Sequence, residues 1–321
     1  MIDTKKVLTM AGFTEIPQDI LKIQTNFSEV QNWIQQTDFN LPLEYYGLPQ
    51  HNSFYKLFKT YKAKFDATPH LQACAFILHK YLFSPNRYNW THNLKRTTID
   101  PLPALILLSG HNTHQHNMQS RKFDTYQQEK HRFRIFETCI RGIDVYKIPG
   151  SEISQLIWGS LFINAHIVEF ARLQFELFKF NYPIPNFTPK DQFCINIHVP
   201  RGDRLPNESV SKSLSYATEY IPQYFFEAPK KPEYFIDSWL MDKKLDLYLP
   251  EKSNIRLFRN RFEILHQLPE SSLSKFLFNT SSSDISQYPS DTSLRQRIKN
   301  ALQNGEKFHD GIAILKQEKT K

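Results

Sequence analysis

A histidine and two polar neighbours are the side chains best suited to moving a proton. His198 ends a predicted strand at residues 191–199 and leads into the segment PRGDRL. Imidazole titrates near neutral pH, so a histidine at a strand end can act as a general base. Asp237 and Ser238 lie in a second predicted strand, residues 232–241, and could orient His198 or hold an acceptor group. The structural alternative is a buried, hydrogen-bonded histidine beside polar groups that only satisfy backbone donors.

The loop after His198 combines positive charge with backbone freedom. A helix is predicted to begin just after it, at Pro206, because proline suits the first helical position. Backbone N–H groups and the positive end of a helix dipole favour anions, so the loop could hold a phosphate. An ordinary strand-to-helix turn is the alternative, because Asp203 and Glu208 would repel a phosphate. The candidate phosphate contacts are Arg201, Gly202 and Arg204.

The nine glycines are too widely spaced for a nucleotide-binding signature. No two of them lie within four residues of each other. This spacing excludes the glycine-rich dinucleotide and P-loop motifs, in which closely spaced glycines let the backbone approach a pyrophosphate. Ser238 also lacks the G-x-S-x-G turn that exposes a nucleophilic serine.

Composition indicates a globular protein of one large or two modest domains. The chain has 321 residues, of which 40% are hydrophobic and 14% aromatic. A chain of this length buries enough surface to need no disulfide or metal for stability. The three cysteines, Cys74, Cys139 and Cys194, are far apart and form no C-x-x-C motif, which indicates a reducing compartment. The first residues lack the apolar region of a signal peptide, so we expect a cytoplasmic protein.

The net charge of +8 raises the question of an anionic partner. Residues 51–100 carry many of the lysines, and such a patch could attract nucleic acid, an anionic cofactor or a membrane surface. No nucleic-acid-binding motif accompanies it, so a solvated helix face is favoured and nucleic acid is not expected as a partner. Residues 153–171 are apolar but contain Asn164, His166 and Glu169, which favours a buried helix over a membrane span.

A histidine-rich segment near residue 111 is the main candidate for metal binding. His111, His114 and His116 form the pattern H-x-x-H-x-H, and three imidazoles can ligate zinc. The segment is polar and predicted to be a loop, and no carboxylate motif lies nearby. We therefore predict no metal site.

The elements that must position these residues divide the chain near residue 169. Residues 1–168 show only helical periodicity, for example at 54–66, 69–83, 101–110 and 121–140. Residues 169–321 mix strands and helices. One predicted helix begins at Pro206. Another spans residues 291–305 and is capped by Asp291. The predicted strands are 172–180, 191–199, 232–241, 253–265, 272–280 and 311–315, and an apolar phase shift within 253–265 suggests a bulge.

Five segments, in one order, resemble a bacterial group of acyltransferase-domain proteins. They are ARLQFE (171–176), NIHVPRGDRL (196–205), DSWLMD (237–242), LPEKSNIRLFRNRF (249–262) and YPSDTSLRQRI (288–298). Trp158 and the DTYQQE segment at 124–129 resemble the helical N-terminal portion of the same group. The chain departs from the group at Ala171, where glycine is common, at Asp203, where a second glycine is common, and at residues 241–243, where Leu-Asp-Pro is frequent.

The resemblance implies an α+β fold and an acyl-transfer activity. It implies an all-helical N-terminal domain, residues 1–168, followed by a GNAT-like C-terminal domain, residues 169–321, with a mixed, mostly antiparallel sheet and flanking helices. The activity it implies moves an acyl group from an acyl-CoA, or a similar thioester, to an amine or hydroxyl of a small molecule. Acyl-CoA would then be a co-substrate that lies along residues 196–208. The alternative is a non-catalytic ligand- or partner-binding protein on a degenerate GNAT-like scaffold.

The matching segments also supply candidate substrate contacts. These are Arg172, Gln174, Trp239, Asn254 and Arg261. For the two arginines, the competing interpretation is a structural network with Glu176, Glu263 or Asp291, because buried arginines need anionic partners.

Overall fold

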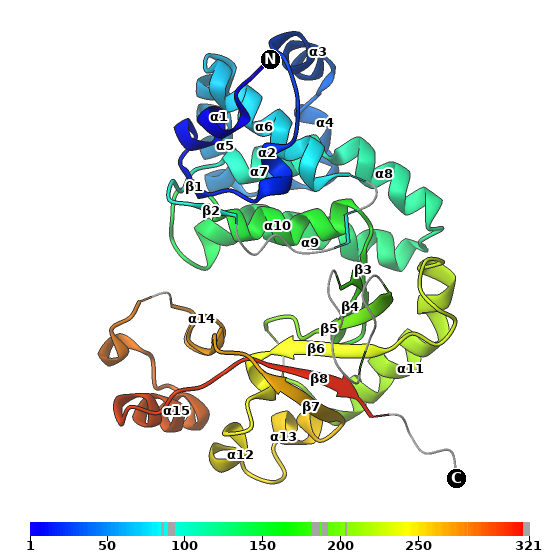
Figure 1. Ribbon diagram of the computed structural model, residues 1–321, viewed down its shortest axis with the longest axis vertical. Helices are drawn as coiled ribbons and strands as arrows, with labels where there is room; N and C mark the ends of the chain where they lie inside the picture. Colours follow the sequence, from blue (N-terminus) through cyan, green and yellow to red (C-terminus); the bar gives the residue numbers. More distant parts are fainter. Residues whose placement is uncertain are drawn as a thin grey trace. The chain divides into compact units, whose positions relative to one another are not determined.

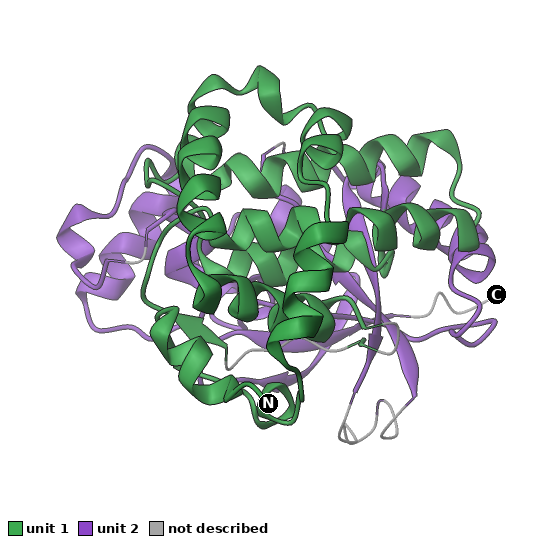
Figure 2. Cartoon of the chain, turned by 90° about the horizontal axis from the view of Figure 1, so that it is seen from above, with its two compact units in different colours: residues 1–168 green, residues 169–321 purple. Residues whose placement is uncertain are grey.

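A computed structural model of the chain describes residues 1–316, apart from residues 85–86, 89–93, 181–186, 188–191, 203 and 281. Asp203 of the predicted phosphate loop therefore lies outside the described residues. The chain divides into two compact units, Met1–Val168 and Glu169–Lys321 (Figure 2). Each unit is described by itself below.

The first unit is mainly helical. Its principal helices are α1 (Thr4–Met10), α3 (Phe27–Gln36), α5 (Asn52–Asp66), α6 (Pro69–Leu82), α7 (Leu102–Ser109), α8 (His111–Ser120), α9 (Thr125–Asp144) and α10 (Ile153–Ile163). Two shorter helices are α2 (Gln18–Leu21) and α4 (Asn40–Tyr45). A short antiparallel ladder joins β1 (Phe13–Glu15) to β2 (Lys95–Arg96).

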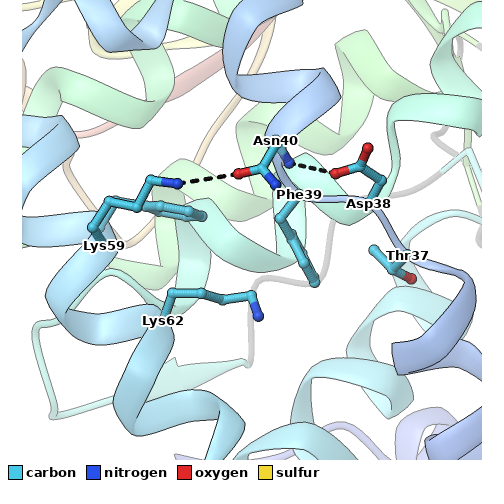
Figure 3. A pocket seen from close by; sticks show the side chains of 7 residues that line it. Thr37, Asp38, Phe39, Asn40, Lys59 and Lys62 are labelled. Atoms are coloured by element: carbon cyan, nitrogen blue, oxygen red, sulfur yellow. Dashed lines mark hydrogen bonds between the residues drawn. The ribbon is translucent and has the colours of Figure 1, made fainter.

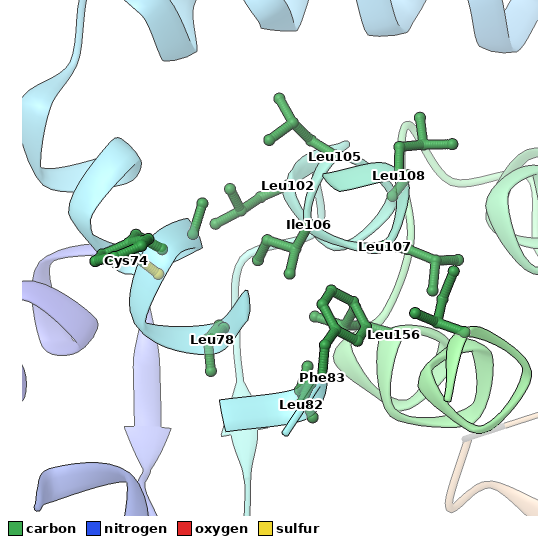
Figure 4. Close-up of a cluster of buried hydrophobic side chains, with 14 of the residues drawn as sticks. Cys74, Leu78, Leu82, Phe83, Leu102, Leu105, Ile106, Leu107, Leu108 and Leu156 are labelled. Carbon is green, nitrogen blue, oxygen red and sulfur yellow. The ribbon is translucent and has the colours of Figure 1, made fainter. Parts of the chain in front are cut away.

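The core of this unit forms where apolar side chains repeat every three or four residues. In α5, Phe54, Phe58, Tyr61 and Phe65 are buried while the lysines stay outside. Helix α7 is buried along almost its whole length, so it lies inside the unit rather than at its surface. Figure 4 shows side chains of α6 and α7 in this cluster, with Leu156 of α10 beside Leu107.

Two predictions for the first unit are wrong: one concerns the type of an element and the other the end of a helix. The histidine-rich segment is helix α8, not a loop. Only Gly110 separates it from the end of α7. The apolar helix predicted over 153–171 ends at Ile163. Ala165 then takes a positive φ of 51°, and the His166 N–H bonds back to the Leu161 carbonyl at 2.9 Å. This is a left-handed helix stop made without the usual glycine.

The second unit is built on a six-stranded sheet with the order β3-β4-β5-β6-β8-β7 (Figure 1). The strands are β3 (Ile167–Phe170), β4 (Leu173–Lys179), β5 (Phe193–His198), β6 (Tyr234–Ser238), β7 (Phe262–Gln267) and β8 (Gly311–Leu315). The β4–β5, β6–β8 and β7–β8 pairs are antiparallel, and β5–β6 is parallel. The helices are α11 (Asn207–Tyr224), α12 (Leu245–Tyr248), α13 (Asn254–Arg259), α14 (Leu273–Leu277) and α15 (Ser293–Gln303). The predicted α+β class, with a mixed and mostly antiparallel sheet, is confirmed.

Three local predictions for the second unit are wrong. Residues predicted as the strand 253–265 form α13 followed by β7, so most of the apolar phase shift marks a helix-to-strand change. A real irregularity in the β7–β8 register lies later, between Ile264 and His266. Residues predicted as the strand 272–280 contain the short helix α14. Helix α15 is capped by Thr292, whose side chain accepts from the Arg295 N–H, rather than by Asp291.

Within the described residues, none of the helices combines the length and the apolar character needed to cross a lipid bilayer.

Candidate active site

Four polar side chains share one face of the sheet where β4 and β5 pair. Gln174 lies opposite His198, and Glu176 lies opposite Asn196. Directly opposed residues, and residues two apart along a strand, point to the same side of a sheet. The sequences Gln-Phe-Glu and Asn-Ile-His therefore bring all four polar side chains together, while Phe175 and Ile197 point to the opposite face.

His198 and Glu176 form a hydrogen-bonded pair. The His198 Nε2 atom lies 2.7 Å from Glu176 Oε2, and the Asn196 side-chain amide donates to the same oxygen at 3.1 Å. The carboxylate of Glu176 has no exposed surface, whereas 20% of the His198 side chain is exposed. An ionised carboxylate only accepts hydrogen bonds, so Nε2 carries the hydrogen and Nδ1 carries the lone pair. Glu176 therefore fixes the tautomer that leaves Nδ1 as the basic atom.

Two amide side chains beside this pair have their orientations fixed by carboxylates. The Gln174 Nε2 group donates to Glu169 Oε2 at 2.7 Å, and the Asn196 Nδ2 group donates to Glu176. Because each NH₂ group must face its carboxylate, each carbonyl oxygen must point the other way. Both oxygens, Gln174 Oε1 and Asn196 Oδ1, are buried and accept no hydrogen bond from the described residues. A buried acceptor without a donor is costly, so these two oxygens are unsatisfied in the structure.

The parallel strands β5 and β6 are registered at only two pairs, Ile195 with Tyr234 and Asn196 with Phe235. Both strands run on past these pairs, to His198 and Ser238. Ligands commonly bind outside the carboxyl ends of neighbouring parallel strands. His198 and Asp237 stand at that end of their strands.

Asp237 is electrostatically coupled to His198. Burial, followed by the nearby charge of Asp310, raises the Asp237 pKa to about 6, and His198 opposes the rise. The side chain keeps substantial contact with solvent, so the rise reflects the density of protein around it rather than complete enclosure. The carboxylate orienting His198 is Glu176, and Asp237 is a second charge close to the imidazole.

The Ser238 side chain is hydrogen-bonded to the backbone of the turn that follows it. Its Oγ atom accepts a hydrogen bond from the Leu240 N–H at 3.2 Å and caps the 3₁₀ turn Trp239–Met241. Trp239 is partly buried and packs against a separate apolar cluster that includes Leu245 and Phe278. Among the described residues, no hydrogen bond joins Ser238 to His198 and no ring contact joins Trp239 to it.

The loop after β5 has an open glycine and one anchored arginine. Gly202 has a φ of +112°, a backbone conformation that residues with a side chain rarely adopt. A Cβ atom at this position would meet nothing within 4 Å. Arg201 donates to Asn279 Oδ1 and, at 2.7 Å, to the Lys275 carbonyl, so its guanidinium is directed at the α14 region. Arg204 is exposed, and its carbonyl accepts from Arg172 Nε at 2.9 Å.

The remaining predicted substrate contacts are two arginines that hydrogen-bond to α11 and one exposed asparagine. The Arg172 backbone N–H donates to Ser213 Oγ at 2.9 Å and thereby ties the start of β4 to α11. The Arg261 guanidinium donates to Asn207 Oδ1 at 2.6 Å and to Ser211 Oγ at 2.7 Å, and so ties the segment before β7 to the first turns of α11. Asp291 pairs with Arg295 instead of either arginine. Asn254 is exposed at the first turn of α13.

Sequence reasoning missed Glu176, Asn196 and Glu169 as members of the site. The available signal was the polar residue at every second position in two otherwise apolar strands, which placed Glu176 beside His198 once the strands were paired. Glu176 was instead considered as a partner of Arg172. Gln174, expected from its motif as a substrate contact, lies opposite His198.

The histidines of α8 do not assemble a metal centre. His111 and His114 are buried, and His114 Nδ1 lies 2.9 Å from the Tyr46 hydroxyl. His116 is exposed and lies 3.4 Å from Ser120 Oγ. Across the part of the chain that the structure describes, no three His, Cys, Asp or Glu side chains are grouped as metal ligands would be.

A separate cavity of about 230 Å³ lies in the first unit (Figure 3). It is lined by residues 37–40, between α3 and α4, and by Phe58, Lys59 and Lys62 of α5. It contains none of the predicted site residues.

Comparison with known proteins finds a family likeness for the second unit. Residues 167–315 match the family model described as the GNAT-like C-terminal domain. The sequence matches no curated protein significantly.

The fold is shared with solved acyltransferase structures. One, an acyltransferase in complex with decanoyl-CoA, is 17% identical with a TM-score of 0.65, over 78% of this chain and 79% of that one. A mutant acyltransferase in complex with octanoyl-CoA is 18% identical with a TM-score of 0.65, over 78% and 80% of the two chains. An acyltransferase in complex with decanoyl-CoA and teicoplanin is 18% identical with a TM-score of 0.64, over the same shares. At these identities the likeness establishes the fold.

Proposed function

We propose that this chain, whose residues 167–315 form a GNAT-like C-terminal domain, transfers an acyl group from an acyl-CoA to an amine of a small-molecule acceptor. The observation that carries the proposal is the His198–Glu176 pair, 2.7 Å apart, at the carboxyl end of a strand that leads into a loop and a helix. A partly exposed imidazole held by a fully buried carboxylate is the arrangement that a general base requires.

The proposed reaction begins at His198 Nδ1. This atom takes a proton from the acceptor nitrogen while the nitrogen lone pair attacks the thioester carbonyl carbon. The tetrahedral intermediate then collapses, the C–S bond breaks, and the departing thiolate receives the proton from the imidazolium. Glu176, bonded to Nε2, stabilises the positive charge that the imidazole carries between these two steps. Asp237, close enough for electrostatic coupling, adds to that stabilisation when it is ionised.

The number of hydrogens on the acceptor atom favours an amine over a hydroxyl. A hydroxyl has one hydrogen, which the base must remove. A primary amine has additional N–H groups, and the Gln174 and Asn196 carbonyl oxygens are two buried acceptors beside the base. We propose that they hold these N–H groups and aim the nitrogen lone pair at the donor.

The proposed donor site follows the loop and the start of α11. The open space at Gly202 lets a phosphate approach the backbone, and the exposed Arg204 supplies charge. The positive end of the 18-residue helix α11 adds to this attraction. Arg201 is proposed to hold the loop against α14 and to contribute only its charge. The octanoyl-CoA and decanoyl-CoA in the structurally similar acyltransferases suggest a donor with a medium-length acyl chain.

Titration calorimetry of the intact protein with acetyl-CoA and decanoyl-CoA tests the donor site. We expect saturable binding, and tighter binding of decanoyl-CoA because its longer chain buries more apolar surface. If neither ligand binds at about 1 mM, the proposal is wrong. Binding without any transfer to primary amines would favour the alternative, a ligand-binding protein on a GNAT-like scaffold.

A further inference from the structure

We propose that Phe276 and Asn279 are positioning residues for the acyl-CoA donor, because they hold the loop after β5 in place through Arg201. The inference rests on the proposed function, in which that loop is part of the donor site. Both residues lie outside the five segments that resemble acyltransferase-domain proteins, so the resemblance assigns them no role.

Three contacts hold the Arg201 guanidinium against the segment 275–279. One of its terminal nitrogens donates to Asn279 Oδ1, and the other donates to the Lys275 carbonyl at 2.7 Å. The central carbon of the guanidinium lies 5.2 Å from the centre of the Phe276 ring, which makes a cation–π contact. Because the guanidinium is planar and its donors point in fixed directions, these contacts together restrict both its position and its orientation.

The segment that holds Arg201 is anchored on its other side. Leu273 and Phe278 are 1% and 2% exposed and belong to the apolar cluster that also contains Ile298 of α15. Arg295 of α15 donates from Nε to the Leu277 carbonyl at 2.8 Å, and so satisfies one of the carbonyls that the end of a helix leaves without a partner. The α14 segment is therefore a fixed support for the loop.

The backbone of Asn279 does not by itself explain why this residue is an asparagine. Asn279 follows Phe278, the C-cap of α14, and has a φ of 56°. Glycine is the usual residue at this position after a helix, because it adopts a positive φ without strain. An asparagine keeps the left-handed turn and also supplies the amide oxygen that Arg201 uses.

An anchored Arg201 lowers the cost of binding the donor. A loop that becomes ordered only when its ligand binds loses affinity to the entropy of ordering. With its guanidinium fixed, Arg201 holds the adjacent Gly202 turn in shape before any donor is present. The His198–Glu176 pair depends on the pairing of β4 with β5 instead. Loss of the support should therefore weaken donor binding and leave the chemical step nearly unchanged.

Titration calorimetry of the full chain with CoA tests the support. The variant Asn279→Gly/Phe276→Leu removes the amide oxygen and the ring without straining the positive φ. We expect its dissociation constant for CoA to rise about tenfold, and its KM for decanoyl-CoA to rise equally, while kcat changes less than about twofold. The matched control, Asn304→Gly/Leu247→Ala, removes an exposed amide and an exposed apolar side chain elsewhere in the second unit and should change the dissociation constant less than about twofold. Thermal melts establish that both variants are folded.

A second background shows whether the effect passes through Arg201. The variant Arg201→Gln should weaken CoA binding, because it removes both the held group and its charge. Adding Asn279→Gly/Phe276→Leu to it should weaken binding by less than about twofold more, because side chains that act through one shared contact are not additive. A general loosening of α14 would instead add its full cost in this background.

The outcomes separate this inference from the proposed function. A wild type that binds no CoA at about 1 mM would contradict both. A wild type that binds CoA, with an Asn279→Gly/Phe276→Leu variant that binds it equally well, would overturn the inference alone. A fall in kcat at unchanged affinity, or an undiminished loss of affinity in the Arg201→Gln background, would also overturn the inference alone.

Discussion

The two units bury titratable side chains in opposite ways. The first unit buries histidines, and burial lowers the pKa of His79 to about 4 and that of His166 to about 3. The second unit buries carboxylates on one sheet face, Glu169 and Glu176, and raises the pKa of Asp237 to about 6.

The difference teaches that burial alone does not identify a reactive group. In the first unit, the buried His114 bonds the Tyr46 hydroxyl at 2.9 Å, and the half-buried His79 has its Nδ1 2.9 Å from Ser109 Oγ. In the second unit, the buried carboxylate Glu176 is connected to an imidazole that reaches solvent. We interpret the first arrangement as packing and the second as the site of chemistry, and we propose that the two units are separate domains.

The largest expected effect is on catalysis in the second unit. The substitution His198→Ala should lower kcat/KM for acyl transfer about 100- to 10,000-fold, because it removes the general base. The free energy of unfolding should change little, since the side chain is partly exposed. Steady-state release of the CoA thiol measures the rate, and urea unfolding measures stability. A variant with near-normal kcat/KM would show that the histidine of the second unit is as structural as those of the first.

Acid should act on the two units with opposite sign. The lowered pKa values of His79 and His166 mean that the folded first unit binds fewer protons than its unfolded chain. Its stability is therefore full above pH 6.5 and declines as the pH falls toward 4, by about 1.4 kcal/mol per unit of pKa shift. Asp237 has a raised pKa, so its contribution is full below its ordinary value near 4 and is lost as the pH rises through 6.

Hydrogen exchange of each unit between pH 7 and 5 measures this contrast. Protection in the first unit should fall on acidification. The second unit should lose less protection than an Asp237→Asn variant does over the same range. Parallel loss in both units, with no effect of the variant, would remove the distinction.

A core histidine should matter for stability and not for rate. The substitution His114→Ala should lower the free energy of unfolding by about 3 kcal/mol, because it leaves a cavity and takes a partner from the buried Tyr46 hydroxyl. Urea unfolding measures the loss. Molecules that stay folded should keep their kcat/KM, and a specific loss of rate would place chemistry in the first unit.

The smallest expected effect compares backbone strain in the two units. Ala171 and Ala165 have φ values of 47° and 51°, a region that costs an L-residue about 1–2 kcal/mol. Glycine relieves the strain but loses more entropy on folding, so each Ala→Gly variant should gain about 0.5–1 kcal/mol. Equal gains would show that the strained turn before β4 is a general stop rather than a feature of the site. Destabilisation by Ala171→Gly would show that this turn is not strained.

Much of the fold was predictable because the spacing of apolar residues along the chain determines most of its helices and strands. The aromatic repeat of α5 and the alternation in β4 and β5 fixed those elements. The errors arose where the glycine that usually ends a helix is missing. Ala165 after α10 and Lys122 after α8 have positive φ values at positions where glycine is usual. The cap at Ser253, whose side chain accepts from the Arg256 N–H, was a readable signal for α13 that strand-like apolar residues outweighed.

The site was predictable only in part, because it depends on cross-strand register. His198, Asp237 and Gln174 could be selected by residue type and motif. The partner of His198 is 22 positions away in sequence, and only the pairing of Glu176 with Asn196 brings its carboxylate to the imidazole. Trp239, Arg172 and Arg261 lie in motifs as conspicuous as that of His198, and the sequence could not indicate that Trp239 packs in a separate apolar cluster or that the two arginines hydrogen-bond to α11.

Transfer by the Glu176→Gln variant is the most direct test of the central claim. The intact chain would be given decanoyl-CoA and hexylamine, and the formation of N-hexyl decanamide would be followed for the wild type and for the variant. An amide at this position keeps the shape of the side chain but can no longer stabilise an imidazolium, so we predict that kcat falls at least about 100-fold with decanoyl-CoA binding unchanged. A variant that forms the amide at the wild-type rate, or a wild type that forms none while it binds decanoyl-CoA, would contradict the account.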